Sequence, residues 1–194
     1  MNLVNLVAAS AAACSILAST ALGADIPKKK QSKAGLYVTA SEANNMLQDD
    51  AVIFIDIRSR AEVAFLGMPV EADINIPYMI MPMLAEYDDE KQGYSLEVNP
   101  DFPNVFSDYA EENNITTTSK IILMCRSGSR SARAADLLFD MGYTNVYSFV
   151  DGYEGDKSKD GPSKGQRTVN GWKNDGLQWS YSIRPDQVYP DDRS

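Results

Sequence analysis

Beyond the apolar first 24 residues, apolar side chains gather along this chain in four short segments, with polar or helix-spaced segments between them. An unbroken apolar run of about four to eight residues is typical of a strand buried on both faces of a parallel sheet. Such runs predict strands at 51–56 and 120–125, and two more mixed stretches predict further strands at 72–78, where Pro77 ends the strand, and at 144–150. Because helical segments alternate with these strands, the pattern favours an α/β fold with a central, mainly parallel sheet flanked by helices.

The segments between the strands carry helix signals. Ser41 is expected to cap a helix over 42–48, and a second helix is expected at about 105–113. After the third strand, four residues at helical spacing share one apolar face: Ala132, Ala135, Leu138 and Phe139. Gly142 then stands where a C-terminal cap belongs. A short terminal helix is expected around Trp172.

The first 24 residues contain no charged side chain and end in the small residues around Ala21–Ala24. This pattern predicts a signal peptide over 1–24 and a mature chain in the periplasm or secreted from the cell. An uncleaved membrane anchor is one alternative, although the run is only weakly hydrophobic and no positive charge precedes it. A lipoprotein attached through Cys14 is another, although the usual Leu three residues upstream is absent.

The rest of the chain has the length of one domain with a substantial core. We expect a polar linker at 25–35, a single domain at 36–181 and a C-terminal tail at 182–194. Two segments look like insertions in that domain: an acidic, proline-bearing stretch at about 79–103 and a Gly- and Lys-rich stretch at about 153–171. No second long apolar run follows the first, so no membrane partner is expected for the mature form.

Composition excludes several function classes. The net charge of −9 argues against a general surface for nucleic acid or anionic membranes. The chain contains no histidine, which removes Ser-His and Cys-His catalysis and the commonest metal ligand. Once Cys14 is removed with the signal peptide, Cys125 is the only thiol. A lone thiol in an oxidising compartment is exposed to oxidation unless it is buried or used, which favours a role for Cys125.

Cys125 ends an apolar strand and directly precedes a helix, the place where α/β sheets bind their ligands. The loop there reads Cys125-Arg126-Ser127-Gly128-Ser129-Arg130. A nucleophilic cysteine must be a thiolate, which inward-facing backbone N–H groups, a helix N-terminus and guanidinium groups all stabilise. Gly128 allows such a turn, the serines can donate hydrogen bonds, and Arg130 and Arg126 could hold a dianion. The alternative is an inert buried cysteine with solvent-facing arginines.

The stretch "CRSGSRSARAADLLFDMGYTNVYSFVDG" resembles the active-site segment of rhodanese-like sulfurtransferases, with their Cys-x-x-Gly-x-Arg-Ser loop. The upstream stretch "FIDIRSRAEVAFLGMPVEADINIPY" is similar to a second family pattern, with matches at Asp56, Arg58, Glu62, Gly67, Ala72, Asn75, Ile76 and Pro77. Downstream, "NGWKNDGLQW" resembles the family's terminal Trp…Gly-Leu segment. The resemblance covers roughly 36–181.

The resemblance implies a ping-pong sulfur transfer. Cys125 would take the outer sulfur of an anionic donor such as thiosulfate as a persulfide, and a thiol or cyanide acceptor, possibly on a protein, would remove it. Loop amides would hold the terminal sulfur, and Arg130 and Arg126 the sulfonate end of the donor. This chemistry needs no histidine, no metal and no organic cofactor, and no nucleic-acid partner is expected.

Other functions stay open at this point. The first is a persulfide carrier that serves a protein partner and has little activity on free thiosulfate; a non-enzymatic regulator of the same fold is a further possibility. A cysteine phosphatase or arsenate reductase would use a Cys-x5-Arg loop. Here the sixth position after Cys125 is Ser131, and Arg130 is the fifth. The shorter loop fits a sulfur atom better than a phosphate.

The chain departs from the family pattern in two ways. Met68 replaces the usual histidine, and the two insertions lengthen the domain. The later insertion carries Lys157, Lys159, Lys164 and Arg167 in an acidic protein, so we expect it near Cys125 as a wall that attracts anionic donors or docks an acceptor. A solvated loop is the alternative. Asp56 and Arg58 are expected to brace the fold. The alternatives are that they brace the Cys125 loop or form an ion pair with Glu62. Aromatic residues are expected to anchor the earlier insertion: Tyr78, Tyr87, Tyr94 and Phe102.

Overall fold

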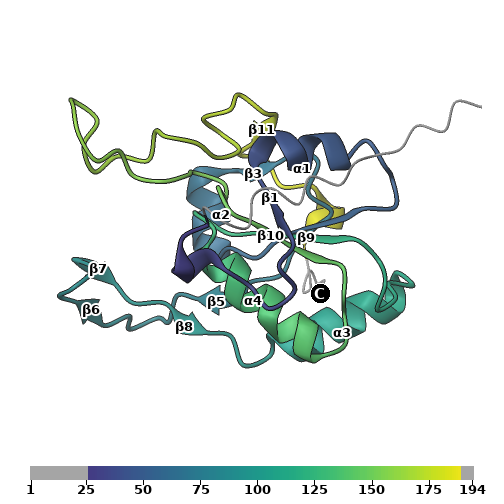
Figure 1. The fold of residues 1–194 in the computed structure, drawn as a ribbon. Helices are drawn as coiled ribbons and strands as arrows, with labels where there is room; N and C mark the ends of the chain where they lie inside the picture. The colour runs from purple at the N-terminus through teal and green to yellow at the C-terminus, as the bar shows by residue number, and fades with distance from the viewer. Residues whose placement is uncertain (1–25, 189–194) are drawn as a thin grey trace, which may run out of the picture.

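Five short parallel strands form the centre of the protein (Figure 1). The computed structural model describes residues 26–188. The strand order is β1-β10-β9-β2-β4, and every neighbouring pair is parallel. The strands are β1 (Tyr37–Val38), β2 (Ile53–Asp56), β4 (Ile74–Asn75), β9 (Ile121–Met124) and β10 (Val146–Phe149). The predicted α/β class and its four strands are therefore confirmed, with β1 as an additional edge strand.

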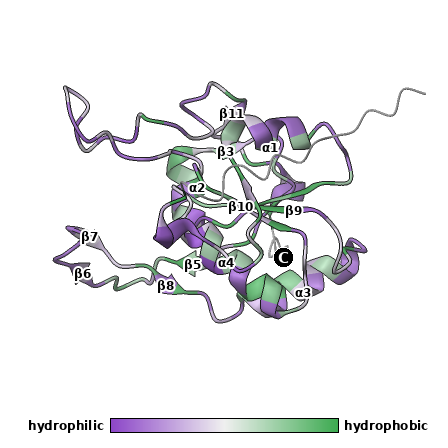
Figure 2. Cartoon of the chain, viewed as in Figure 1, coloured by the Kyte–Doolittle hydropathy of each residue, from purple (hydrophilic) through white to green (hydrophobic). Residues whose placement is uncertain are grey.

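Helices cover both faces of this sheet. They are α1 (Ala40–Met46), α2 (Arg60–Leu66), α3 (Phe102–Glu112) and α4 (Ser129–Asp140). Successive strand residues point to opposite faces, so Ile121 and Leu123 pack with α3 and α4, whereas Ile122 and Met124 pack with α1, α2 and Trp172. The central strands are hydrophobic along their length, whereas the helices carry polar residues on one side (Figure 2).

Three helix predictions need correction. The cap of α1 is Thr39, not Ser41, because its side chain and that of Glu42 form a reciprocal capping box. Phe139 lies on the solvent side of α4, since α4 is covered by the sheet on one side only. The chain around Trp172 is a series of turns between the positive-φ residues Gly171 and Gly176, although the Trp172 ring itself is fully buried.

The earlier insertion is more regular than its sequence indicates. Strands β5 (Met79–Ile80) and β8 (Glu97–Val98) pair antiparallel at its base, and β6 (Tyr87–Asp88) and β7 (Gly93–Tyr94) pair further out. We call residues 79–98 the acidic arm. Tyr78 and Phe102 anchor its base as predicted, but Tyr87 and Tyr94 are exposed and face each other across the outer hairpin.

The ends of the described chain pack onto the domain. Residues 25–35 were expected to be a linker, but Lys30 is buried against the sheet, where its Nζ donates to Val150 O and to Asp156 at 2.9 Å. In the expected tail, Gln187 is buried and donates to Ala72 O at 2.7 Å. The predicted signal peptide lies outside the described residues. Between residues 26 and 188, no helix is long and apolar enough to cross a membrane.

Strand β11 (Trp179–Ser180) closes the domain by pairing antiparallel with β3 (Met68–Pro69). Two short 3₁₀ helices, Lys28–Lys30 and Pro185–Gln187, complete the elements of the described chain. The indole N–H of Trp172 donates to Gln178 O at 2.7 Å, so this buried aromatic residue links the last turns to the core.

Asp56 and Arg58 form a fully buried ion pair at the carboxyl end of β2. The Arg58 guanidinium donates from Nε to both carboxylate oxygens of Asp56, at 3.0 and 3.1 Å, and from a second nitrogen to Gly67 O at 2.7 Å. The guanidinium carbon lies 3.8 Å from the centre of the Tyr153 ring. Arg58 therefore ties β2 to the turn after α2. Asp56 and Arg58 pair with each other, which agrees with their expected role in bracing the fold; the alternative, an ion pair with Glu62, is wrong.

Replacing Asp56 with Asn should destabilise the protein strongly, because it leaves the Arg58 charge buried without a counter-ion. We expect the free energy of unfolding to fall by about 3–5 kcal/mol. The control is Asp140→Asn, which removes the partner of Lys33 in an exposed pair and should cost less than about 1 kcal/mol. Urea denaturation of both variants measures the difference, and equal costs would contradict this account of the buried pair.

Candidate active site

Cys125 lies where β9 ends, directly before the turn that leads into α4. Its side chain is enclosed, with the residue only 1% exposed. Two backbone N–H groups at the start of α4 point at its sulfur: Gly128 N lies 3.2 Å and Ser131 N 3.4 Å from Sγ. Helix N-termini and inward-facing amides stabilise negative charge. The predicted cradle for the sulfur is therefore present.

Ser131 is a site residue that the sequence reasoning did not include. Its hydroxyl accepts a hydrogen bond from Cys125 N at 2.9 Å, while its own backbone N–H faces the sulfur. Ser131 thus closes the loop from both ends. The available signal was the Cys-x-x-Gly-x-Arg-Ser loop itself, whose last serine is Ser131, in the first turn of the helix, where a hydroxyl can turn back to the preceding loop. By contrast, the hydroxyls of Ser127 and Ser129 make no hydrogen bond within residues 26–188.

The loop after β10 holds the Cys125 loop from the other side. Tyr153 N donates to Cys125 O at 2.8 Å, and Glu154 N donates to Arg126 O at 3.0 Å. The two loops approach so closely that a Cβ on Gly128, whose φ is +92°, would lie 2.2 Å from Val150 O. Only glycine fits at this position, because both the conformation and the space exclude a side chain.

Arg130, in the first turn of α4, pairs with Glu62 of α2. The two guanidinium nitrogens lie 2.7 and 2.6 Å from the two carboxylate oxygens, a bidentate arrangement that is largely buried. Burial by itself would raise the pKa of Glu62, but the hydrogen bond and charge of Arg130, with the Ser59 contacts, lower that pKa to about 2. Burial also opposes the charge of Arg130, yet Glu62 and the charge of Cys125 raise its pKa.

Arg126 and Arg167 form a second group of positive charge beside Cys125. Arg126 pairs with Glu154, which follows β10. Arg167 donates to Gly155 O at 2.6 Å and makes no ion pair in the described part of the chain; its Nε is buried without a hydrogen-bond partner. Burial, and then the charge of Arg126, lower the pKa of Arg167, while the charges of Glu154, Asp156 and, last, Cys125 act in the opposite sense. Arg167 is therefore a half-buried cation whose pKa responds to the charge of Cys125.

The other predicted site residues lie further back or outside. Asp56 and Arg58 are buried behind the loop and brace the sheet edge. The Lys157 side chain is exposed. Its backbone forms an isolated β-bridge with that of Arg167, and the backbones of Ser158 and Lys164 form another. We call residues 155–167 the basic arm, because they carry four basic and two acidic side chains. Residues 26–188 contain no cluster of three or more acidic or cysteine residues placed to hold a metal ion.

Replacing Glu62 with Gln tests the ion pair through its pH dependence. A carboxyl whose folded pKa is lowered stabilises the fold above its unfolded pKa, and this contribution is lost as the pH falls towards the folded value. Since the pKa of Glu62 is lowered from 4.5 to about 2, the pair contributes on the order of 3 kcal/mol at neutral pH. We expect Glu62→Gln to be less stable at pH 7, with the difference shrinking steadily below about pH 4.5. Urea denaturation across this range measures it, and a difference that does not change with pH would contradict the role of Glu62.

Comparisons with known proteins agree with this architecture. The sequence model of the rhodanese-like domain matches residues 39–159. The uncharacterised protein RP600 of Rickettsia prowazekii is 27% identical over 145 residues, which cover 74% of this chain and 96% of that protein. The crystal structure of Rv0390 from M. tuberculosis aligns with a TM-score of 0.54 and 25% identity, over 75% of this chain and 96% of that one.

A more distant relative is a tRNA uridine(34) hydroxylase of Legionella pneumophila, 26% identical over 122 residues, which cover 61% of this chain and 38% of that protein. The similarity reaches only part of that protein. The family match covers more than half of the present chain and includes both Glu62 and the whole Cys125 loop. The chain therefore belongs to the rhodanese-like domain family.

Proposed function

We propose that the protein is a sulfurtransferase that moves a sulfane sulfur from an anionic donor such as thiosulfate to a thiophilic acceptor through a persulfide on Cys125. One observation carries this proposal: the Cys125 sulfur accepts two backbone N–H groups at a helix N-terminus, in a loop flanked by three arginines. The five-residue step from Cys125 to Arg130 also separates it from Cys-x5-Arg phosphatases.

The reaction follows from this arrangement. The Cys125 thiolate attacks the outer sulfur of thiosulfate; the S–S bond of the donor breaks, and its electron pair leaves with sulfite. An acceptor such as cyanide then attacks the outer sulfur of the persulfide, forming thiocyanate and returning Cys125 to the thiolate. The same amides that face Sγ can hold the added sulfur, because its negative charge suits their positive ends.

A carrier function is the second candidate, and a specific observation favours it. Arg130 and Arg126 already have carboxylate partners, so neither is a free cation for a small dianion. Such a carrier would accept sulfur from one protein and deliver it to another. Steady-state transfer from thiosulfate to cyanide distinguishes the two candidates, because only an enzyme of the first kind turns over free thiosulfate efficiently.

Treatment with thiosulfate should add one sulfur atom to Cys125. Intact-protein mass spectrometry should show a gain of about 32 Da, one sulfur atom, since the persulfide is covalent. Cys125→Ser should show neither the added mass nor any transfer to cyanide, whereas Ser127→Ala, which removes a hydroxyl without a hydrogen bond in the described chain, should keep both. Persistence of the added mass in Cys125→Ser would exclude the proposed nucleophile.

Arg167 is the arginine that we expect to receive the anionic end of the donor, because it forms no ion pair among residues 26–188, unlike Arg126 and Arg130. We expect Arg167→Gln to raise KM for thiosulfate by about 10-fold or more, the range for a lost hydrogen bond to a charged group. The change in kcat should be small.

The matched control for that variant is Lys159→Gln, which removes an exposed charge from the same arm and should change KM by less than about 2-fold, because exposed charges are screened by solvent. Steady-state kinetics at low and high salt separate the two residues. Equal effects of both substitutions would mean that the arm acts through its total charge and not through Arg167.

A further inference from the structure

The acidic arm carries several large apolar side chains that are exposed to solvent. Met83 and Leu84 are 99% and 89% exposed, and other apolar side chains of the arm are exposed beside them: Ile80, Met81, Tyr87, Tyr94 and Val98. Exposing a large apolar side chain forgoes about 1.5–3 kcal/mol of burial. Contiguous exposed apolar surface on a soluble domain typically marks an interaction site.

Backbone hydrogen bonds hold this arm in a defined shape although it buries little. Ser95 N donates to Glu86 O at 2.8 Å, and Asn99 N donates to Tyr78 O at 3.0 Å. The Asn99 side chain also donates to Pro77 O at 2.9 Å. An isolated two-stranded hairpin is only marginally stable in water. The arm therefore has the form of a preformed ligand surface that gains stability when something covers it.

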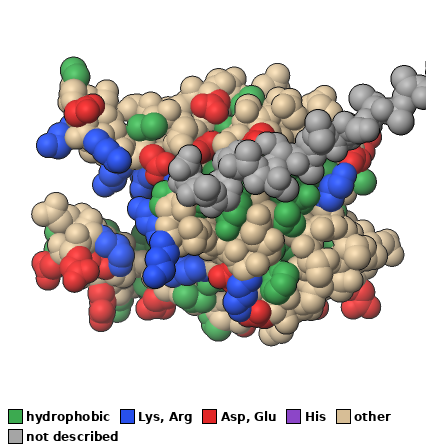
Figure 3. Space-filling model, in the orientation of Figure 1, with side chains coloured by type: hydrophobic (Ala, Val, Ile, Leu, Met, Phe, Trp, Pro, Cys, Tyr) green, Lys and Arg blue, Asp and Glu red, His purple; other side chains and the backbone are tan. Residues whose placement is uncertain are grey.

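Sheet topology places the acidic arm on the same side of the domain as Cys125. The arm leaves the carboxyl end of β4, the basic arm leaves the carboxyl end of β10, and Cys125 ends β9 between them in a parallel sheet. Both arms project in the same direction (Figure 1), and Lys and Arg side chains line the space between them (Figure 3). At the arm's base, Arg133 of α4 donates to Met79 Sδ at 3.6 Å.

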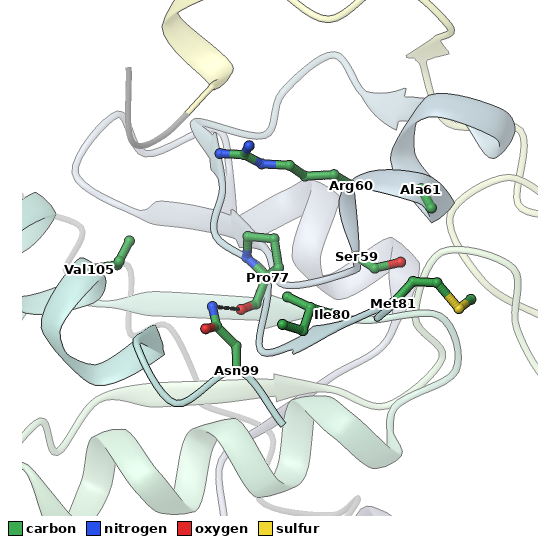
Figure 4. Close-up of a pocket in the computed structure, with 8 residues that line it drawn as sticks. All are labelled: Ser59, Arg60, Ala61, Pro77, Ile80, Met81, Asn99 and Val105. Carbon is green, nitrogen blue, oxygen red and sulfur yellow. Dashed lines mark hydrogen bonds between the residues drawn. The ribbon is translucent and has the colours of Figure 1, made fainter. Parts of the chain in front are cut away.

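A mainly apolar hollow of about 310 Å³ lies where the acidic arm meets α2. Ile80 and Met81 of the arm line it together with Ser59 and Arg60, at the start of α2 (Figure 4). Glu62, one turn further along α2, is the residue that pairs with Arg130. The apolar side chains of Ile80 and Met81 thus line a concave site at the start of α2, the helix that also carries the partner of Arg130.

The charge on the arm indicates what could cover it. Residues 79–98 carry five acidic side chains and one lysine. Four of the acidic residues are exposed beside the apolar ones: Glu86, Asp89, Glu90 and Glu97. A partner that buries the apolar residues must bring positive charge to this rim, because like charges across an interface are destabilising.

We propose that the acidic arm docks a protein that accepts sulfur from Cys125, through an apolar segment flanked by lysine or arginine and carrying a cysteine. This proposal rests on the sulfurtransferase function proposed above and names the class of its acceptor. The partner's thiolate attacks the outer sulfur of the Cys125 persulfide. The bond between Sγ and that sulfur breaks, its electron pair stays on Cys125 as the thiolate, and the partner cysteine becomes the persulfide, with no net oxidation.

Synthetic cysteine peptides test the proposal with the full-length protein. The first peptide combines apolar residues with lysines, the second replaces the lysines with glutamates, and the third replaces the apolar residues with serines. Cys125 is loaded with thiosulfate, and mass spectrometry follows the rate at which sulfur appears on each peptide. We expect the first peptide to react at least about 10-fold faster than the other two, a difference of about 1.4 kcal/mol.

Variants of the arm locate the effect. Met83→Ser/Leu84→Ser changes two side chains that the fold does not bury, so it should lower the rate with the first peptide by about 10-fold and leave transfer to cyanide unchanged. Glu86→Lys/Asp89→Lys should do the same and favour the glutamate peptide. The control is Phe139→Ser, a partly exposed residue at the other end of α4, which should change no transfer rate.

Three outcomes would overturn the proposal. One is equal reactivity of the three peptides, another is a peptide rate that the arm variants do not alter, and the third is a dimer in solution that the arm variants dissociate, which would assign the surface to a second copy. Failure of the proposed function looks different, because Cys125 would then take up no sulfur from thiosulfate and transfer to cyanide would be absent as well.

Discussion

Backbone pairing of β9 with its two parallel neighbours is the constraint on which the rest of the site depends. Asp56 of β2 lies opposite Met124, and Ser148 of β10 lies opposite Leu123. The strands β2, β9 and β10 therefore end at nearly the same position along the sheet. Ile57 N continues the pairing to Met124 O at 2.9 Å, and Tyr153 N continues it to Cys125 O at 2.8 Å. The reactive loop is therefore held on both sides by main-chain bonds, and side chains only refine its shape.

Charge near Cys125 is balanced and not simply positive. Arg130 and Arg126 face the loop, but Glu62 and Glu154 neutralise them from the neighbouring elements. Such pairs keep the arginines in place while the site is empty, and they reduce the attraction of the loop for any anion. The half-buried Arg167 forms no ion pair in the described chain, so of the three arginines it is the one without a direct carboxylate contact.

The two arms also carry charge of opposite sign near the end of the sheet that holds Cys125. Both leave the carboxyl edge of the sheet, the edge that carries Cys125, and they differ in sign of charge and in apolar content. The basic arm carries Arg167, whereas the acidic arm presents Met83 and Leu84 to solvent. Insertions at this edge can change which molecules reach the sulfur without disturbing the sheet, because the core on both faces is complete without them.

The sequence by itself determined the class of fold, the four central strands and the place of Cys125 between a strand and a helix. These features depend on near neighbours in the chain: apolar runs, a Gly-containing loop and helical spacing around Ala132 and Leu138. The local signals failed where neighbours compete, as at the cap of α1, where Thr39 and not Ser41 meets Glu42.

Only the tertiary structure decided which charges meet. The partner of Arg130 lies 68 positions away and that of Arg126 lies 28 positions away, distances over which the chain carries no pairing signal. The same holds for the partial burial of Arg167 and for the exposure of the acidic arm, which the packing of distant elements determines. The reason is physical, since spacing along the chain predicts which residues share a strand or helix, whereas the solvation of a charge depends on everything folded around it.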